Sequence, residues 1–185
     1  MVEQVLSGLT RSADLRILIV RHMPDGFTER FAERLDTRSE YSVTEASDGD
    51  RIADGETLVA PGGKHMLVSN YVGSRVRVRL TDDPPVNSVR PAVDVTMSSV
   101  SEVIDDPIIG VILTGMDGDG ADGITAIIAQ DEATSAVVGK PTRAIGISSV
   151  DDVLPISSVS TGILEATRAG DNQSQTDGRD RETGT

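Results

Sequence analysis

The stretch IIGVILTGMDGDGADG, residues 108–123, constrains the fold more than any other part of the chain. It opens with six residues that are apolar or glycine, the composition of a parallel strand buried on both faces of a sheet. Three aspartates and four glycines follow within residues 114–123. A metal loop, a phosphate-binding turn and an acyl-transfer site would each explain part of this pattern, and only the rest of the chain distinguishes them.

Strand-like and helix-like segments alternate along the chain. The clearest of these segments is a β-hairpin, in which Arg75, Arg77 and Arg79 alternate with apolar residues after a Gly-Ser turn. The alternation predicts an α/β fold with a mostly parallel sheet and the antiparallel hairpin at its edge. The predicted strands are residues 16–20, 41–46, 56–63 and 108–115, with the hairpin over 65–80, and the predicted helices are residues 2–9, 27–36, 90–104 and 156–170.

The composition excludes several classes of site. The chain has 185 residues, enough for one domain with a sizeable core, and no cysteine, which excludes disulfides, thiolate metal sites and a cysteine nucleophile. Only His22 and His65 are available for a histidine metal site, and we predict neither a metal nor a cofactor. The net charge of -13 argues against nucleic-acid binding. An acidic surface with almost no lysine also fits a protein solvated by concentrated salt.

The ends and the hydropathy of the chain bear on its location. No apolar run approaches the roughly 20 residues that span a bilayer, and the first residues lack the apolar core of a signal peptide. We therefore predict a cytoplasmic protein without direct membrane insertion. Residues 169–185 are polar and are predicted to be a disordered acidic tail, which leaves residues 1–168 as the folded domain.

Two loops are candidates for chemistry. In α/β sheets ligands bind beyond the carboxyl ends of the strands. RHMP at residues 21–24 supplies a histidine there, and GMDGDG at residues 115–120 supplies carboxylates. A histidine oriented by a carboxylate is two-thirds of a nucleophilic hydrolase site, and glycine-rich backbone offers N–H groups to an oxyanion.

Plainer interpretations stay open at this point. A lone histidine is often structural, and Asp/Gly-rich loops are often only turns. APGGKHM reads equally well as a strand-ending turn with Lys64 and His65 at its tip. A calcium loop starting at Asp117 fails, because its fifth, sixth and twelfth positions hold Ala121, Asp122 and Ile128. A Walker-type phosphate loop is absent, since no Gly-Lys-Ser/Thr follows the glycines.

Five blocks of sequence, in order, resemble the chemotaxis protein-glutamate methylesterases. They are RHMPDGFTERFAERLD, EASDGDRIADGETLVAPGGKHM, PPVNSVRPAVDVTMSSV, GVILTGMDGDGADG and IAQDEATSAVVGKPTRAI. The resemblance implies a doubly wound fold with a mostly parallel sheet in three α/β/α layers. It also implies hydrolysis of methyl esters on glutamates of chemoreceptor cytoplasmic helices, with release of methanol, and deamidation of receptor glutamines. The expected partners are those methylated receptors and a chemotaxis kinase or adaptor.

The resemblance assigns roles to three residues. His22 matches the histidine of the family's HMP motif and is expected to be the general base. Asp119 matches the aspartate of the GMGxDG motif and is expected to orient that histidine. The backbone N–H of Met116 is expected to help stabilise the oxyanion.

The chain departs from the family pattern in three places. The family's first strand and the serine turn after it are expected to be missing, and neither Ser7 nor Ser12 lies in a glycine-rich turn, so no nucleophile is assigned. Asp117 replaces a glycine near the expected oxyanion site, and the connection after Asp119 is shorter than in the family. Two hypotheses follow: a methylesterase catalytic domain that is incomplete at its N-terminus, or a catalytically inactive, truncated relative that binds receptors or adaptors.

Overall fold

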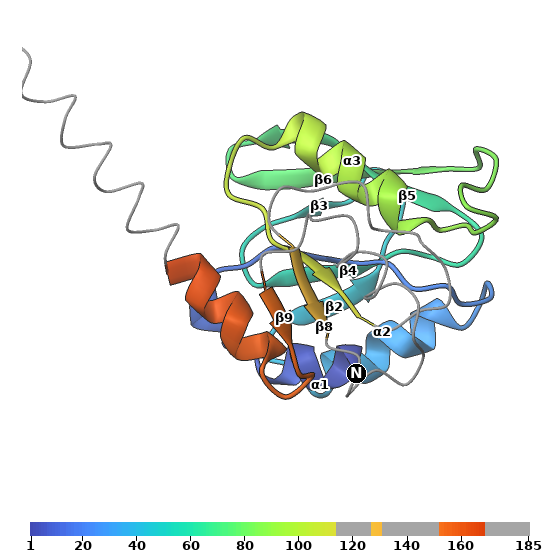
Figure 1. The fold of residues 1–185 in the computed structure, drawn as a ribbon. Helices are drawn as coiled ribbons and strands as arrows, with labels where there is room; N and C mark the ends of the chain where they lie inside the picture. Colours follow the sequence, from blue (N-terminus) through green and yellow to red (C-terminus); the bar gives the residue numbers. More distant parts are fainter. Residues whose placement is uncertain (114–126, 131–151, 169–185) are drawn as a thin grey trace, which may run out of the picture.

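The computed structural model describes residues 1–113, 127–130 and 152–168. Within these ranges the strands form three sheets of three strands each, two parallel and one antiparallel. Figure 1 shows the antiparallel sheet and α3 (Val93–Val103) on one side of the molecule, and α1 (Val2–Ser7) and α2 (Thr28–Asp36) on the other. The predicted tail at residues 169–185 lies outside the described residues.

The first parallel sheet has the order β1 (Ile17–Ile19), β4 (Glu56–Val59) and β2 (Ser42–Glu45). Helix α2 connects β1 to β2 and buries one of its own faces against the sheet. The sequence places Phe27, Phe31, Ala32 and Leu35 at helical spacing on one apolar stripe. Phe31, Ala32 and Leu35 are buried, whereas Phe27, which precedes the first residue of the helix, is 59% exposed and does not belong to the buried face. Burial of this face holds the helix on the sheet without help from a cap, since no side chain of the described residues caps its N-terminus.

The second parallel sheet contains β7 (Gly110–Ile112), β8 (Ile127–Gln130) and β9 (Asp152–Leu154). The strand expected within residues 108–115 is therefore present, and it is parallel as predicted. Val111 and Leu113 pack against the same apolar cluster as Ile19 of β1, so the two parallel sheets share a core. A helix at residues 159–168 follows β9 and packs against α1, where the Ser160 hydroxyl donates to the Val5 carbonyl at 2.9 Å.

The predicted hairpin consists of β5 (His65–Val72) and β6 (Arg75–Thr81). Gly73 and Ser74 both have positive φ, 58° and 59°, as a two-residue turn that matches the twist of the strands requires. The third strand of this sheet is β3 (Arg51–Ile52), which pairs with β6. As far as the chain is described, the hairpin lies in a sheet of its own, at the margin of the parallel strands rather than hydrogen-bonded to them.

Helix α3 covers the outer edge of β5. The Thr96 hydroxyl donates to the Met66 carbonyl at 2.6 Å, and the Val68 N–H donates to the Ser99 hydroxyl at 2.9 Å. Thr96 and Ser99 are buried, so two helix side chains satisfy backbone groups of a strand edge that would otherwise lack partners. The sequence places Val93, Met97, Val100 and Ile104 on one apolar face of this helix, but it does not predict the polar contacts of Thr96 and Ser99.

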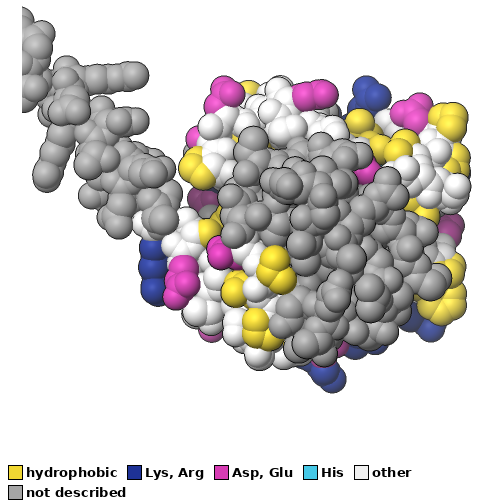
Figure 2. All heavy atoms as spheres, viewed as in Figure 1, with side chains coloured by type: hydrophobic (Ala, Val, Ile, Leu, Met, Phe, Trp, Pro, Cys, Tyr) yellow, Lys and Arg dark blue, Asp and Glu magenta, His cyan; other side chains and the backbone are white. Residues whose placement is uncertain are grey.

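Charged side chains are spread over the described surface. Figure 2 shows Asp, Glu, Lys and Arg side chains around the rim of one face, with apolar side chains between them. None of the described helices has the length and apolarity needed to cross a membrane.

Candidate active site

The carboxyl ends of the strands in the first parallel sheet meet at one edge. Ile19 lies in register with Val59, and the Ala60 N–H donates to the Ile19 carbonyl at 2.9 Å, which continues the pairing past both strand ends. The segments that leave these ends are residues 20–24 and residues 61–63. They therefore begin side by side, where such folds bind ligands.

Gly62 allows these two segments to touch. A β-carbon at this position would lie 2.5 Å from the Asp25 backbone nitrogen and 2.7 Å from the Met23 carbonyl oxygen. Both neighbours are backbone atoms, which cannot move aside as a flexible side chain would. Only glycine fits here, and the contact holds the segment after β1 against the turn after β4.

A buried hydroxyl links the turn after β4 to the end of β2. Thr28, in the first turn of α2, is fully buried, and its hydroxyl oxygen accepts a hydrogen bond from the Gly62 N–H at 3.2 Å. The hydroxyl in turn donates to the Glu45 carboxylate at the end of β2. One side chain thereby links the ends of β4 and β2 to the start of α2, and residues 20–27 connect β1 to that fixed point.

His22 lies within this supported segment, and its side chain is exposed. Its neighbour Arg21 places its guanidinium carbon 5.1 Å from the centre of the Phe31 ring, a cation–π contact with α2. The backbone around His22 is therefore anchored on both sides, while the imidazole remains accessible to solvent. This is the arrangement that a base acting on an external substrate requires.

His65 has the opposite environment. It is 1% exposed; its Nδ1 accepts from the Ala92 N–H at 3.2 Å, and its Nε2 lies 3.2 Å from the Pro84 carbonyl oxygen. Because the Ala92 N–H can only donate, the ring hydrogen must be on Nε2, which donates to Pro84. The interpretation that placed His65 at the tip of a turn is wrong: the side chain is buried and both ring nitrogens bond backbone groups. Lys64 is exposed, as expected.

The other predicted site residues are not brought together with His22 by the described structure. Met116, Asp117 and Asp119 lie outside the described residues, which resume after β7 only at β8. The Ser7 hydroxyl donates to the Gln4 carbonyl and the Ser12 hydroxyl donates to Thr10 Oγ1, each at 3.1 Å.

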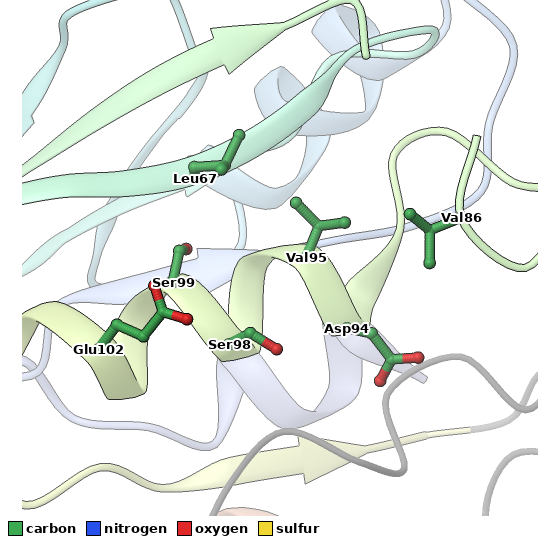
Figure 3. Close-up of a pocket in the computed structure, with 7 residues that line it drawn as sticks. All are labelled: Leu67, Val86, Asp94, Val95, Ser98, Ser99 and Glu102. Carbon is green, nitrogen blue, oxygen red and sulfur yellow. The ribbon is translucent and has the colours of Figure 1, made fainter. Parts of the chain in front are cut away.

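A hollow of about 330 Å³ lies elsewhere, beside α3. Figure 3 shows that its lining side chains come from α3, from β5 and from the loop that contains Val86. Neither histidine is among these lining residues, and the Ser99 hydroxyl is already bonded to the backbone of β5 and α3. The hollow is therefore separate from the candidate site. Within residues 1–113, 127–130 and 152–168, no group of three or more His, Asp or Glu residues is placed to hold a metal ion.

The comparison with known proteins decides the family. The chain matches the CheB methylesterase model over residues 1–163. The chain belongs to the CheB methylesterase family. It is 59% identical over 172 residues to a protein-glutamate methylesterase/protein-glutamine glutaminase of Haloarcula marismortui, covering 89% of this chain and 47% of that protein. A protein of the same name from Salmonella typhimurium is 42% identical over 176 residues, covering 91% and 50%.

A solved CheB structure has the same fold. The crystal structure of the Thermotoga maritima CheB methylesterase catalytic domain matches with a TM-score of 0.82 at 34% identity, covering 89% of this chain and 90% of that one. The resemblance seen in the sequence and the predicted α/β fold are thus confirmed. The chain spans about half the length of the curated CheB relatives it matches.

The two histidines should differ sharply in their effect on stability. His65→Ala leaves the buried Ala92 N–H without a partner, removes the bond to the Pro84 carbonyl and opens a cavity, so we expect the free energy of unfolding to fall by about 2–4 kcal/mol. His22→Ala, at an exposed position, should change it by less than about 0.5 kcal/mol. Urea unfolding followed by circular dichroism measures both, and equal losses would refute the assignment.

Gly62 and its neighbour Gly63 provide a matched pair. Gly62→Ala forces a β-carbon into backbone atoms, and we expect a loss of about 3 kcal/mol in the free energy of unfolding. Gly63 has φ +79°, and a β-carbon added there would meet nothing within 4 Å, so Gly63→Ala should cost only the backbone strain, about 1 kcal/mol. Thermal and urea unfolding of the two variants compare them directly. A Gly62→Ala protein as stable as Gly63→Ala would show that the close contact is not a constraint.

Proposed function

We propose that this chain carries the hydrolytic centre of a chemotaxis methylesterase, which cleaves glutamyl methyl esters on chemoreceptors and releases methanol. The observation that carries the proposal is the family match over residues 1–163, together with an exposed His22 held at the carboxyl edge of the sheet. The names of the relatives from Haloarcula marismortui and Salmonella typhimurium support deamidation of receptor glutamines as a second activity.

His22 is the proposed general base. In this chemistry an imidazole removes the proton from a nucleophilic hydroxyl as that oxygen attacks the ester carbonyl, and then gives the proton to the departing methoxide. With a glutamine substrate the same proton goes to the nitrogen that departs as ammonia, so one site serves both reactions. The burial of His65 supports this choice, since both of its nitrogens are occupied by backbone groups.

Asp119 and Met116 complete the proposal. The Asp119 carboxylate accepts a hydrogen bond from His22 Nδ1–H, which fixes the tautomer that presents Nε2 to the nucleophile and stabilises the imidazolium. The Met116 N–H donates to the oxygen of the tetrahedral intermediate. Both residues follow β7, which packs into the same core as β1. The nucleophile is a serine in this chemistry, and we assign it to neither Ser7 nor Ser12.

The proposed partners follow from the reaction. Methylated chemoreceptor cytoplasmic helices are the substrates, and a chemotaxis kinase or adaptor is the proposed regulatory partner. The proposed location is the cytoplasm, where such helices are exposed. The net charge of -13 disfavours nucleic acid as a partner.

Methanol release from labelled, methylated receptors tests the roles of His22 and Asp119. In the chain supplied with the family's serine turn as nucleophile, we expect His22→Ala and Asp119→Asn each to reduce the rate at least about a thousandfold, because each removes one member of a coupled catalytic group. Asp122→Asn is the control: it makes the same change in the same loop at an aspartate that the family resemblance gives no role.

Three outcomes would refute parts of this proposal. Near-normal turnover by His22→Ala or Asp119→Asn would exclude these residues as base and orienting group. An equal loss in Asp122→Asn would indicate that the loop is merely sensitive to substitution. No methanol release by the chain supplied with the serine turn would favour the non-catalytic, receptor-binding alternative.

A further inference from the structure

Four arginines lie on the outward face of the antiparallel sheet. They are Arg51 of β3 and Arg75, Arg77 and Arg79 of β6, and all four are exposed, whereas the alternating Val76 and Val78 are buried. We call these four residues the arginine face. Figure 1 shows the strands that carry it, β3 and β6, on the same side of the molecule as α3.

The concentration of positive charge here is unusual for this protein. The whole chain has 17 Lys and Arg against 30 Asp and Glu, yet four of the 17 share one small sheet face. Arg51 and Arg77 lie directly opposite each other in register, an arrangement of like charges that destabilises a sheet. Alternate residues of a strand are separated by about 7 Å, so Arg75, Arg77 and Arg79 form a row of closely spaced charges.

The protein does not neutralise this row within the part that the structure describes. The ion pairs found there join Arg16 to Asp54, and Arg34 and Arg38 to Glu3, and none involves the arginine face. The acidic loop before β3 forms hydrogen bonds with the backbone rather than any of these ion pairs. In that loop Asp48 accepts from the Leu80 N–H at 2.9 Å and Asp50 from the Ser47 N–H at 2.7 Å.

The form of the partner follows from the sheet order. Strand β6 is the middle strand, between β3 and β5, so its edges are paired and cannot accept a further strand. A ligand of this surface must lie across the face, as helices do on sheets. A helix with acidic residues four positions apart presents carboxylates about 6 Å apart, close to the spacing of the arginines.

An apolar residue beside the row favours protein over other polyanions. Val72 is 69% exposed and lies opposite Arg75 in the hairpin. An exposed valine gains from contact with a side chain but not from contact with a phosphate backbone. The net charge of -13 further opposes nucleic acid and anionic lipid, whose charge extends well beyond one small patch.

We propose that the arginine face binds an acidic α-helix of a partner protein, whose Asp or Glu side chains pair with the arginines of β6 and whose apolar side chain covers Val72. Guanidinium groups form two parallel hydrogen bonds with one carboxylate, so the pairing is specific in direction as well as charge. None of the four arginines belongs to the segments that form the candidate active site. Loss of helix binding at the arginine face and loss of ester hydrolysis at the candidate active site can therefore be measured separately.

Fluorescence anisotropy of a labelled, helical 20-residue peptide with glutamate at every fourth position tests this proposal on the full chain. We expect the triple variant Arg75→Gln, Arg77→Gln, Arg79→Gln to bind about tenfold or more weakly, since it removes three ion pairs. The matched control is Arg30→Gln, Arg34→Gln, Arg38→Gln on and just after α2. It makes the same change in net charge, but two of the arginines that it removes already pair with Glu3. The affinity of this control variant for the peptide should change less than about twofold.

The result that overturns the proposal is equal affinity of the arginine-face variant and the unmodified protein, or an equal loss in both triple variants. Tighter binding of a duplex DNA oligonucleotide or of phosphatidylserine vesicles than of the peptide would also overturn it, because the partner would then not be an acidic protein helix. Circular dichroism melting confirms that each variant is folded. If the triple variant unfolds, the single variant Arg75→Gln, next to the hairpin turn, should still bind about threefold more weakly and an unchanged affinity contradicts the proposal.

Discussion

The contact between Gly62 and the backbone of residues 23–25 is the constraint on which the candidate site depends. Two chain segments leave neighbouring parallel strands, and they can pack backbone to backbone only because one of them has no β-carbon at the meeting point. Thr28 then adds a buried hydroxyl that joins the turn, the start of α2 and the end of β2. The result is a short loop that is fixed at both ends while the His22 side chain between them faces solvent. Catalytic groups need this combination of a rigid support and an accessible tip.

The two histidines show how environment rather than residue type assigns a role. His65 comes directly after the same glycine-rich turn, yet it is buried and holds the loop of Pro84 and the start of α3 by bonding their backbone groups. His22 is exposed on the loop that Gly62 supports, where a substrate can reach its ring. The separation matters for the family chemistry, because a single accessible imidazole leaves no ambiguity about which histidine serves as the base.

Much of this organisation could be predicted from the sequence. The apolar run that contains β7, the helical spacing of Phe31, Ala32 and Leu35, and the Arg/Val alternation of β6 each reflect local periodicity, and each produced the predicted element. The division of strands among three sheets could not be predicted, because it depends on pairing between distant segments, including a β3 of two residues. The roles of Gly62, Thr28 and Ser99 could not be predicted from the sequence either. A turn glycine and two ordinary hydroxyls acquire their importance only when the fold brings a backbone group of another element next to them.

The central claim is that His22 is an oriented base paired with Asp119, and the ¹⁵N chemical shifts of its ring nitrogens test it most directly. The chain has only two histidines, and His65, with its hydrogen on Nε2, provides an internal reference. In the uncharged ring of His22 we predict that the hydrogen is on Nδ1, and that Asp119→Asn transfers it to Nε2 while the signals of His65 stay unchanged. A His22 ring with the same tautomer in both proteins would contradict the pairing, and with it the proposed geometry of the site.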